Sequence, residues 1–169
     1  CSIIRFVELP IANAGSDDKI CGLTYPLSGT LSLPLGKSQG SWKQISGTGT
    51  ADFADGSNPK TDVTVSICGI YQFVWTEDNN GCTSTDTVQI IFSQPPTLTL
   101  LDTVCNNIYT NYTVKFKVEG CGAPYTITGM TGGNLVGDIY TSNPINAGTI
   151  DYSYTVVDVY GCKQVITGS

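Results

Sequence analysis

The chain has 169 residues, among which there is no histidine, a single methionine and few charged side chains. Histidine is the usual general base, the usual nitrogen ligand of zinc and the usual proton shuttle, so its absence weakens most hydrolase and metalloenzyme interpretations. Charged residues make up 13% of the chain, against about 25% in ordinary soluble domains. This composition argues against charge-driven disorder, and we predict a folded protein that is not an enzyme.

The charges that are present make the chain acidic, with 8 Lys and Arg against 14 Asp and Glu and a formal net charge of −6. Nucleic-acid binders need a basic surface to neutralise phosphates, so we expect no nucleic-acid partner. Long apolar runs are also missing. The longest, Val88-Gln89-Ile90-Ile91-Phe92, is the length of a strand, whereas a membrane helix needs about 18 apolar residues. The sequence predicts no membrane-spanning segment.

Strand signals dominate what remains, because Thr, Val, Ile, Tyr and Gly replace the usual helix formers. Apolar and polar residues alternate with period two in residues 61–67, 71–75 and 112–118, which is the pattern of a strand with one buried face. Turn sequences such as Asp55-Gly56-Ser57-Asn58-Pro59 and Asn79-Asn80-Gly81 separate these runs. Short strands at this spacing predict an all-β fold built from sandwiches.

Two modules are indicated by the segment Ser93-Gln94-Pro95-Pro96, which reads as a short stiff linker. A weak internal repeat supports this division. Residues 69–82 and 148–162 both carry an aromatic alternating strand that leads through an acidic turn to Gly-Cys. We therefore predict one sandwich over residues 11–94 and a second over 95–169, with residues 1–10 as a strand of a preceding module or a linker.

The residues themselves resemble a known family. In the first half the resemblance is carried by Ala12–Gly22, Gly40-Ser41-Trp42, Gly69–Glu77 and Gly81-Cys82. In the second half it is carried by Val104-Cys105, Tyr112–Val114, Pro124–Gly129, Ser142–Ile145 and Gly161-Cys162. These runs resemble the immunoglobulin-like and PKD-like repeats of large Bacteroidetes surface proteins, which are gliding-motility-associated and leave the cell by type IX secretion.

The resemblance implies two tandem immunoglobulin-like β-sandwiches in a secreted, cell-surface adhesin. Its implied function is structural and adhesive: the modules extend the protein and present binding surface, without catalytic residues. The implied partners are neighbouring modules of the same chain or identical subunits, and surface glycans. Two other functions stay open. One is a filament subunit assembled by β-strand complementation through residues 1–10, and the other is a carbohydrate-binding accessory module of a secreted enzyme.

Cysteine is abundant, and its spacing fits disulfides better than metal binding, because there is no C-x-x-C pair and no histidine. The seven cysteines are Cys1, Cys21, Cys68, Cys82, Cys105, Cys121 and Cys162. Positions shared by the two halves favour Cys21–Cys82 and Cys105–Cys162. Immunoglobulin strand order instead places Cys21 with Cys68 and Cys121 with Cys162, so these are alternative partners. Cys1 is the odd thiol, and it also fits the lipidated first residue of a mature lipoprotein.

Four acidic residues are weak candidates for structural Ca²⁺ ligands, namely Asp17, Asp18, Glu77 and Asp78. They fall at or beside expected loops, where oxygen ligands gather around Ca²⁺. However, no D-x-D-x-D-G run is present, and Asp is common in turns because it bonds to the local backbone.

Three further residues are candidates for recognition or modification. Trp42 lies beside glycines and is a candidate for stacking on a carbohydrate. Asp86-Thr87-Val88 and Asp102-Thr103-Val104 match the short Asp-Thr-apolar pattern of Bacteroidetes O-glycosylation. The resemblance therefore implies Thr87 and Thr103 as glycosylation sites, although such tripeptides also arise by chance in Thr-rich strands.

Overall fold

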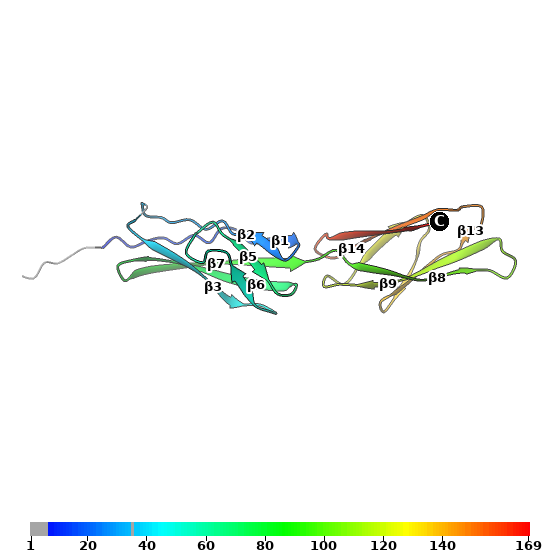
Figure 1. The fold of residues 1–169 in the computed structure, drawn as a ribbon, viewed down its shortest axis with the longest axis horizontal. Coiled ribbons are helices and arrows are strands. Elements are labelled where there is room, and N and C mark those ends of the chain that lie inside the picture. The colour runs from blue at the N-terminus through cyan, green and yellow to red at the C-terminus, as the bar shows by residue number, and fades with distance from the viewer. Residues whose placement is uncertain (1–6, 35) are drawn as a thin grey trace, which may run out of the picture. The chain divides into compact units, whose positions relative to one another are not determined.

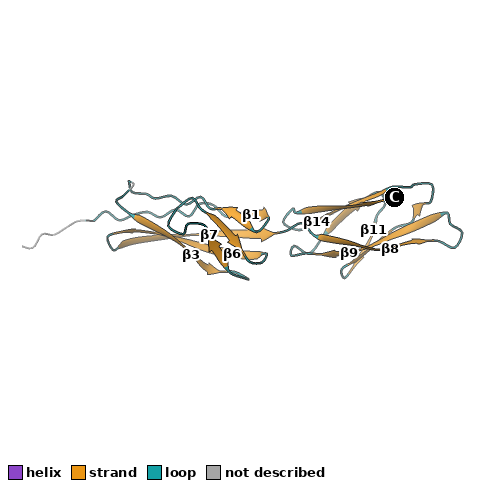
Figure 2. Cartoon of the chain, in the orientation of Figure 1, coloured by secondary structure: helices purple, strands orange, loops and turns teal. Residues whose placement is uncertain are grey.

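The computed structural model describes residues 7–34 and 36–169, and the described chain consists of strands and loops (Figure 2). It divides into two compact units, Cys1–Phe92 (unit 1) and Ser93–Ser169 (unit 2). The division falls at the start of the segment that carries Pro95-Pro96. The all-β class predicted from the sequence is confirmed. Within the described ranges there is no helix long and apolar enough to span a bilayer.

Unit 1 pairs its strands into two sheets. The first has the order β1-β7-β6-β3 and the second has the order β2-β5-β4. Figure 1 shows β3, β6 and β7 side by side. The bounds are β1 (Asp18–Cys21), β2 (Thr24–Pro26), β3 (Gln39–Ser46), β4 (Ala51–Phe53), β5 (Asp62–Val65), β6 (Gly69–Asn79) and β7 (Cys82–Ser93).

Unit 2 also has two sheets. One has the order β10-β14-β15, and the other has the order β11-β12-β9-β13 with β8 paired to β9. The bounds are β8 (Thr97–Cys105), β9 (Asn111–Glu119), β10 (Thr126–Gly129), β11 (Gly133–Val136), β12 (Ile139–Ser142), β13 (Ile145–Asn146), β14 (Tyr152–Val157) and β15 (Lys163–Gly168).

Each unit has its own core, which the period-two alternation of its central strand creates. In β6 the side chains of Tyr71, Phe73 and Trp75 all point inward and are fully buried. The Trp75 ring packs on the Trp42 ring with centroids 5.1 Å apart. In unit 2, Tyr154 of β14 packs against Phe116 of β9, with ring centroids 5.8 Å apart. Burial of such large rings is the main stabilising contribution in domains of this size.

The two units differ in the strand that accompanies their first segment. In unit 1, residues 11–21 run along β7, because β1 pairs with β7 and three further hydrogen bonds tie the segment to this strand. These bonds run from Ala12 N–H to Ser84 Oγ (3.1 Å), from Ala14 N–H to Asp86 Oδ2 (2.8 Å) and from Gln89 N–H to Asp17 Oδ1 (2.8 Å). In unit 2 the first strand, β8, pairs instead with β9.

The strand predicted over residues 1–10 lies partly outside the described residues, which begin at Val7. Residues 7–10 are not assigned to a strand. The backbone there is held by a side chain, since Asn79 Nδ2 donates to the carbonyl of Glu8 at 2.8 Å. This segment therefore approaches unit 1 at the end of β6.

Gly40 provides a test of the aromatic core. A Cβ atom at this position would lie 2.0 Å from Cζ2 of Trp75, so Gly40→Ala forces a buried ring to move. We expect a loss of about 1–3 kcal/mol in the free energy of unfolding of unit 1. Tryptophan fluorescence reports this unit alone, because both tryptophans, Trp42 and Trp75, lie in it.

Gly22→Ala is the matched control, because a Cβ atom there meets nothing within 4 Å. It should leave the unfolding midpoint near that of the unsubstituted chain. Equal losses in the two variants would contradict the close packing of Gly40 on Trp75.

Candidate functional site

The cysteines are the first predicted site that the structure corrects. Cys82 and Cys105 are free thiols, so the favoured pairs Cys21–Cys82 and Cys105–Cys162 are wrong. The disulfide-bonded cysteines are Cys21, Cys68, Cys121 and Cys162. Unit 1 holds the first two and unit 2 holds the last two. Cys1 lies outside the described residues. The alternative drawn from immunoglobulin strand order names the same four cysteines.

The backbone shows why these positions suit disulfides. Beside Cys21 and Cys68, Val65 N–H donates to the carbonyl of Leu23 at 2.8 Å. Beside Cys121 and Cys162, Val159 N–H donates to the carbonyl of Gly122 at 3.0 Å. The Gly-Cys turn shared by the two units marks an equivalent hairpin rather than an equivalent cross-link, since Cys82 is free.

Trp42 is not a carbohydrate platform, and this prediction is wrong. The side chain is only 6% exposed. Its ring packs on Trp75, and its Nε1 donates to the carbonyl of Pro59 at 3.3 Å. Strand pairing explains the error, because β3 places Trp42 directly opposite Trp75 and so on the same inward face.

The four acidic candidates each accept hydrogen bonds from nearby backbone or side-chain groups. Asp17 accepts from Gln89 N–H, Asp78 from Gly81 N–H and Asp18 from the Tyr25 hydroxyl, at 2.8, 2.8 and 2.9 Å. Burial, together with the Asp18 carboxylate, raises the pKa of Tyr25. Among the described residues, no three or more acidic, Cys or His side chains form a group that could hold a metal ion.

The two glycosylation candidates are accessible. Thr87 is an exposed residue of β7, and Thr103 is an exposed residue of β8. Modification would require such exposure. Their role as attachment sites stays a prediction.

Glu77 is a fully buried carboxylate at the end of the aromatic face of β6. It accepts hydrogen bonds from Ser38 Oγ (2.6 Å), from the N–H (2.9 and 3.1 Å) and Oγ (3.0 Å) of Ser32, and from Leu33 N–H (3.2 Å). Burial raises the pKa of Glu77, but these bonds outweigh it and hold the pKa below its ordinary value of 4.5. The carboxylate therefore fastens the segment that leads into β3.

Asp158 is the corresponding buried acid of unit 2, and it was not among the site residues predicted from the sequence. It accepts hydrogen bonds from Ser93 Oγ (2.6 Å), Tyr160 N–H (2.9 Å) and Cys162 N–H (2.7 Å). A signal was present, because the buried alternation of Tyr152, Tyr154 and Val156 continues to residue 158. Counting by two along this strand would have placed the carboxylate inside.

A polar side chain at the end of the central strand thus holds the segment through which the chain enters each unit. We call this arrangement the junction clamp. In unit 1 it is Asn79 Nδ2 donating to the carbonyl of Glu8, and in unit 2 it is Ser93 Oγ donating to Asp158. A buried proline follows each clamp, Pro10 or Pro96. The arrangement fixes the position of the backbone where the chain enters each unit.

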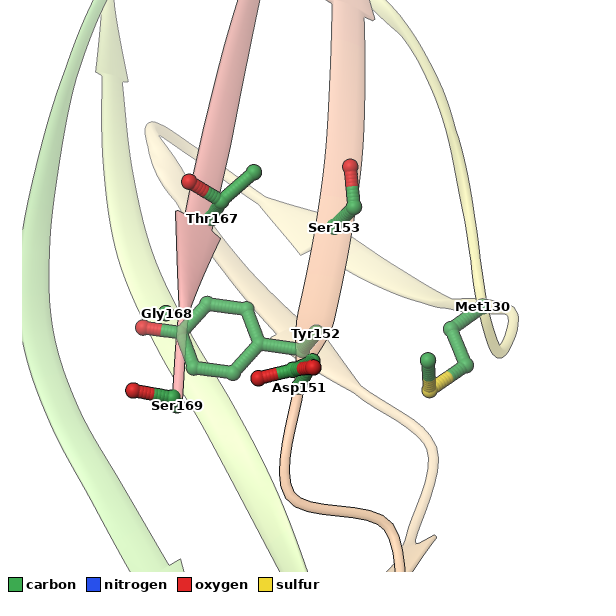
Figure 3. A pocket seen from close by; sticks show the side chains of 7 residues that line it. All are labelled: Met130, Asp151, Tyr152, Ser153, Thr167, Gly168 and Ser169. Atoms are coloured by element: carbon green, nitrogen blue, oxygen red, sulfur yellow. The ribbon is translucent and has the colours of Figure 1, made fainter.

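Unit 2 also carries two shallow hollows that meet at Tyr152, Thr167, Gly168 and Ser169. Their volumes are about 430 and 500 Å³. Figure 3 shows the Tyr152 ring against Gly168, with Thr167 and Ser153 on neighbouring strands. A Cβ atom at Gly168 would lie 2.3 Å from the Tyr152 hydroxyl oxygen, so any other residue here would force the Tyr152 ring to move. The hollows mark the end of strand β15.

The comparisons with known proteins bear on the fold. No protein-family model and no curated protein matches the chain. Among solved structures, immunoglobulin domains 1–4 of Sidekick-1 match 99% of this chain over 49% of their own, with a TM-score of 0.55 and 10% identity. The N-terminal eight immunoglobulin domains of DSCAM match 94% of this chain over 27% of theirs, with a TM-score of 0.59 and 12% identity.

Extracellular domains 3–5 of Drosophila OTK match 97% of this chain over 61% of theirs, with a TM-score of 0.53 and 11% identity. The chain therefore spans less than two thirds of the length of each of these structures. Identities this low show the fold alone. The chain consists of immunoglobulin-like β-sandwiches in tandem.

The disulfide assignment predicts a labelling pattern. Iodoacetamide added to the unreduced, folded chain should modify the exposed Cys105 readily and the half-buried Cys82 more slowly. The four bonded cysteines should react only after reduction, and peptide mapping should recover Cys21 with Cys68 and Cys121 with Cys162. Reduction should lower the free energy of unfolding by about 2–5 kcal/mol for each bridge. A Cys21–Cys82 peptide would contradict the assignment.

Glu77 predicts a dependence of stability on pH. Its pKa is lower in the folded chain than the ordinary 4.5, so its contribution is complete above pH 4.5 and is lost as the pH falls through the folded pKa. Glu77→Gln should cost about 1–3 kcal/mol at pH 7, and the difference from the unsubstituted chain should shrink below pH 4.5. Urea unfolding followed by tryptophan fluorescence measures both.

The matched control is Asp52→Asn, which removes an exposed carboxylate from β4 of the same unit. It should leave the stability at pH 7 nearly unchanged. A Glu77→Gln difference that stays constant from pH 7 to pH 3 would show that the charge of Glu77 does not stabilise the fold.

Proposed function

We propose that the chain is a pair of non-enzymatic, structural and adhesive repeat modules from a secreted cell-surface protein. Their task is to extend the protein and to present binding surface, with neighbouring modules of the same chain as their first partners. The observation that carries this proposal is the junction clamp, which occurs once in each unit. It favours modules that were made to be joined end to end.

The two clamps hold the entering segment with different groups: the Asn79 amide donates to the carbonyl of Glu8, whereas Ser93 Oγ donates to the Asp158 carboxylate. Glu8 and Ser93 lie 85 residues apart, and each precedes a proline by two residues. Each is held by a side chain at the end of the central strand of the unit that follows it. Proline limits the conformations of a linker, and the clamp fixes its second half. A repeated junction of this kind supports an array, because an isolated domain needs no such device.

The redox state of the cysteines supports an extracellular location. Disulfides persist in oxidising compartments and are rare in the cytosol, and this chain has four disulfide-bonded cysteines. The resemblance to Bacteroidetes surface repeats adds the same location and proposes type IX secretion. Surface glycans are proposed as further binding partners, and Thr87 and Thr103 are proposed separately as sites at which this chain is O-glycosylated.

The carbohydrate-binding alternative loses its main residue, since Trp42 is buried in the core of unit 1. The filament alternative assigned strand donation to residues 1–10, most of which lie outside the described residues. Among the described residues, no contact supports either alternative as directly as the junction clamp supports tandem modules.

The test is the intact mass of the protein released from its native source without reduction. We expect a mass well above that of 169 residues, with peptides that continue beyond Cys1 or Ser169. The added sequence should repeat a proline junction at intervals of about 85 residues, because each module of this fold class has nearly the same length. Recombinant protein of the present length is the mass control. A native chain that both begins at Cys1 and ends at Ser169 would contradict the proposal.

A further inference from the structure

Strand β15 has a free edge. It pairs with β14 on one side, and no strand of unit 2, all of which is described, pairs with its other side. The reason is that β8 pairs with β9 of the opposite sheet along its whole length. An unpaired edge presents backbone N–H and C=O groups that match those of any extended chain.

Unit 1 shows what covers the same edge when it is closed. Strand pairing places Val88 opposite Phe73 in unit 1 and Ile166 opposite Tyr154 in unit 2, so β7 and β15 correspond. The edge of β7 is covered by residues 11–21, through β1 and the hydrogen bonds at Ser84, Asp86 and Gln89. The occupant of such an edge is therefore an extended backbone. In unit 2 no strand pairs with this edge, although β8 lies close to β15.

The free edge also lacks the features by which folded proteins protect their edges. Strand β15 has six residues and no proline or bulge, and its single charge, Lys163, lies at its beginning. By contrast, β2, at the edge of its sheet in unit 1, has three residues and ends at Pro26. Proline and short length both discourage pairing. On the outward face of β15, Val165 is 47% exposed.

We propose that β15 pairs with β15 of a second copy of this chain, antiparallel and around a two-fold axis at Val165. The pairing would join the two three-stranded sheets β10-β14-β15 into one. It deepens the proposed function, on which it rests, by giving the adhesive modules a homophilic contact between chains. Asp158 N–H donates to the carbonyl of Cys162 at 2.9 Å, and this phase makes residues 164, 166 and 168 the ones that bond to β14. Lys163, Val165 and Thr167 therefore direct their backbone groups outward.

A second copy fits this edge because, in an antiparallel pair of two β15 strands, the facing side chains suit each other. An axis at Val165 places the two Val165 side chains opposite each other, which buries an exposed apolar group. It also places Lys163 opposite Thr167 of the second copy, so that no like charges face each other. Beyond the strand end, Leu100 and Ile150, which are 47% and 75% exposed, line the neighbouring hollow and border the contact.

Sedimentation equilibrium over a concentration series tests the proposal. The unsubstituted chain should dimerise, and Val165→Lys should weaken the dimer by about tenfold or more, because it places two lysines opposite each other. Thr128→Lys is the control, since Thr128 is an exposed residue of β10 at the far edge of the same sheet. It should dimerise like the unsubstituted chain.

Cross-linking gives an independent readout, because it detects the dimer directly and does not depend on a substitution that weakens it. In a chain whose other thiols are removed by Cys1→Ser, Cys82→Ser and Cys105→Ser, the variant Val165→Cys should form a covalent dimer on mild oxidation. Opposed residues across a two-fold axis lie within disulfide range. Thr128→Cys in the same background should stay monomeric.

Three results would overturn the pairing: an unsubstituted chain that is monomeric at every concentration, a dimer that survives Val165→Lys, or equal cross-linking at residues 128 and 165. Each of these leaves the tandem-module proposal standing, because that proposal depends on the length of the native chain. A native chain of only 169 residues would in turn leave the dimer measurement unaffected.

Discussion

The strict alternation of buried and outward side chains along one central strand in each unit determines most of the remaining structure. In unit 1 this strand is β6, whose inward residues are Tyr71, Phe73, Trp75 and Glu77. In unit 2 it is β14, whose inward aromatic residues lead to Asp158. The rings build the core, and the acid that ends the series bonds to the adjoining segments. Because the side chains lie on a two-residue repeat, a slip by one position would expose the rings and the acid together.

The ends of these two strands explain how a chain with so few charges organises its loops. Two carboxylates are removed from solvent and surrounded by hydroxyl and N–H donors. A buried carboxylate without partners would be costly, whereas a satisfied one fixes several backbone positions at once. The chain therefore uses acids as structural fasteners. The entering segments are held at the same strand ends, by Asn79 in unit 1 and by Asp158 in unit 2, so core packing and module joining depend on one strand in each unit.

Much of this fold could be predicted from the sequence, because alternation, turn residues and the Pro95-Pro96 segment are local signals. The burial of Trp42 and the pairing of the cysteines depend on which strands are neighbours, and this is not a local signal. Trp42 is buried because β3 pairs with β6, and Cys82 is free although it follows a Gly-Cys pattern shared by both units. Asp158 is different, because it continues the two-residue alternation of buried side chains in β14. Extending that alternation by one more step predicts that Asp158 is buried.

The two units share a fold but differ in the sheet with which their first segment pairs. Unit 1 turns its first residues onto its own last strand and becomes self-contained there. Unit 2 pairs its first strand with the other sheet, so that no strand pairs with the outer edge of its last strand. A change confined to about the first dozen residues of a module would thus convert an inert spacer into an associating one. The spacing of associating modules along such a protein could therefore change in evolution without any change in a hydrophobic core.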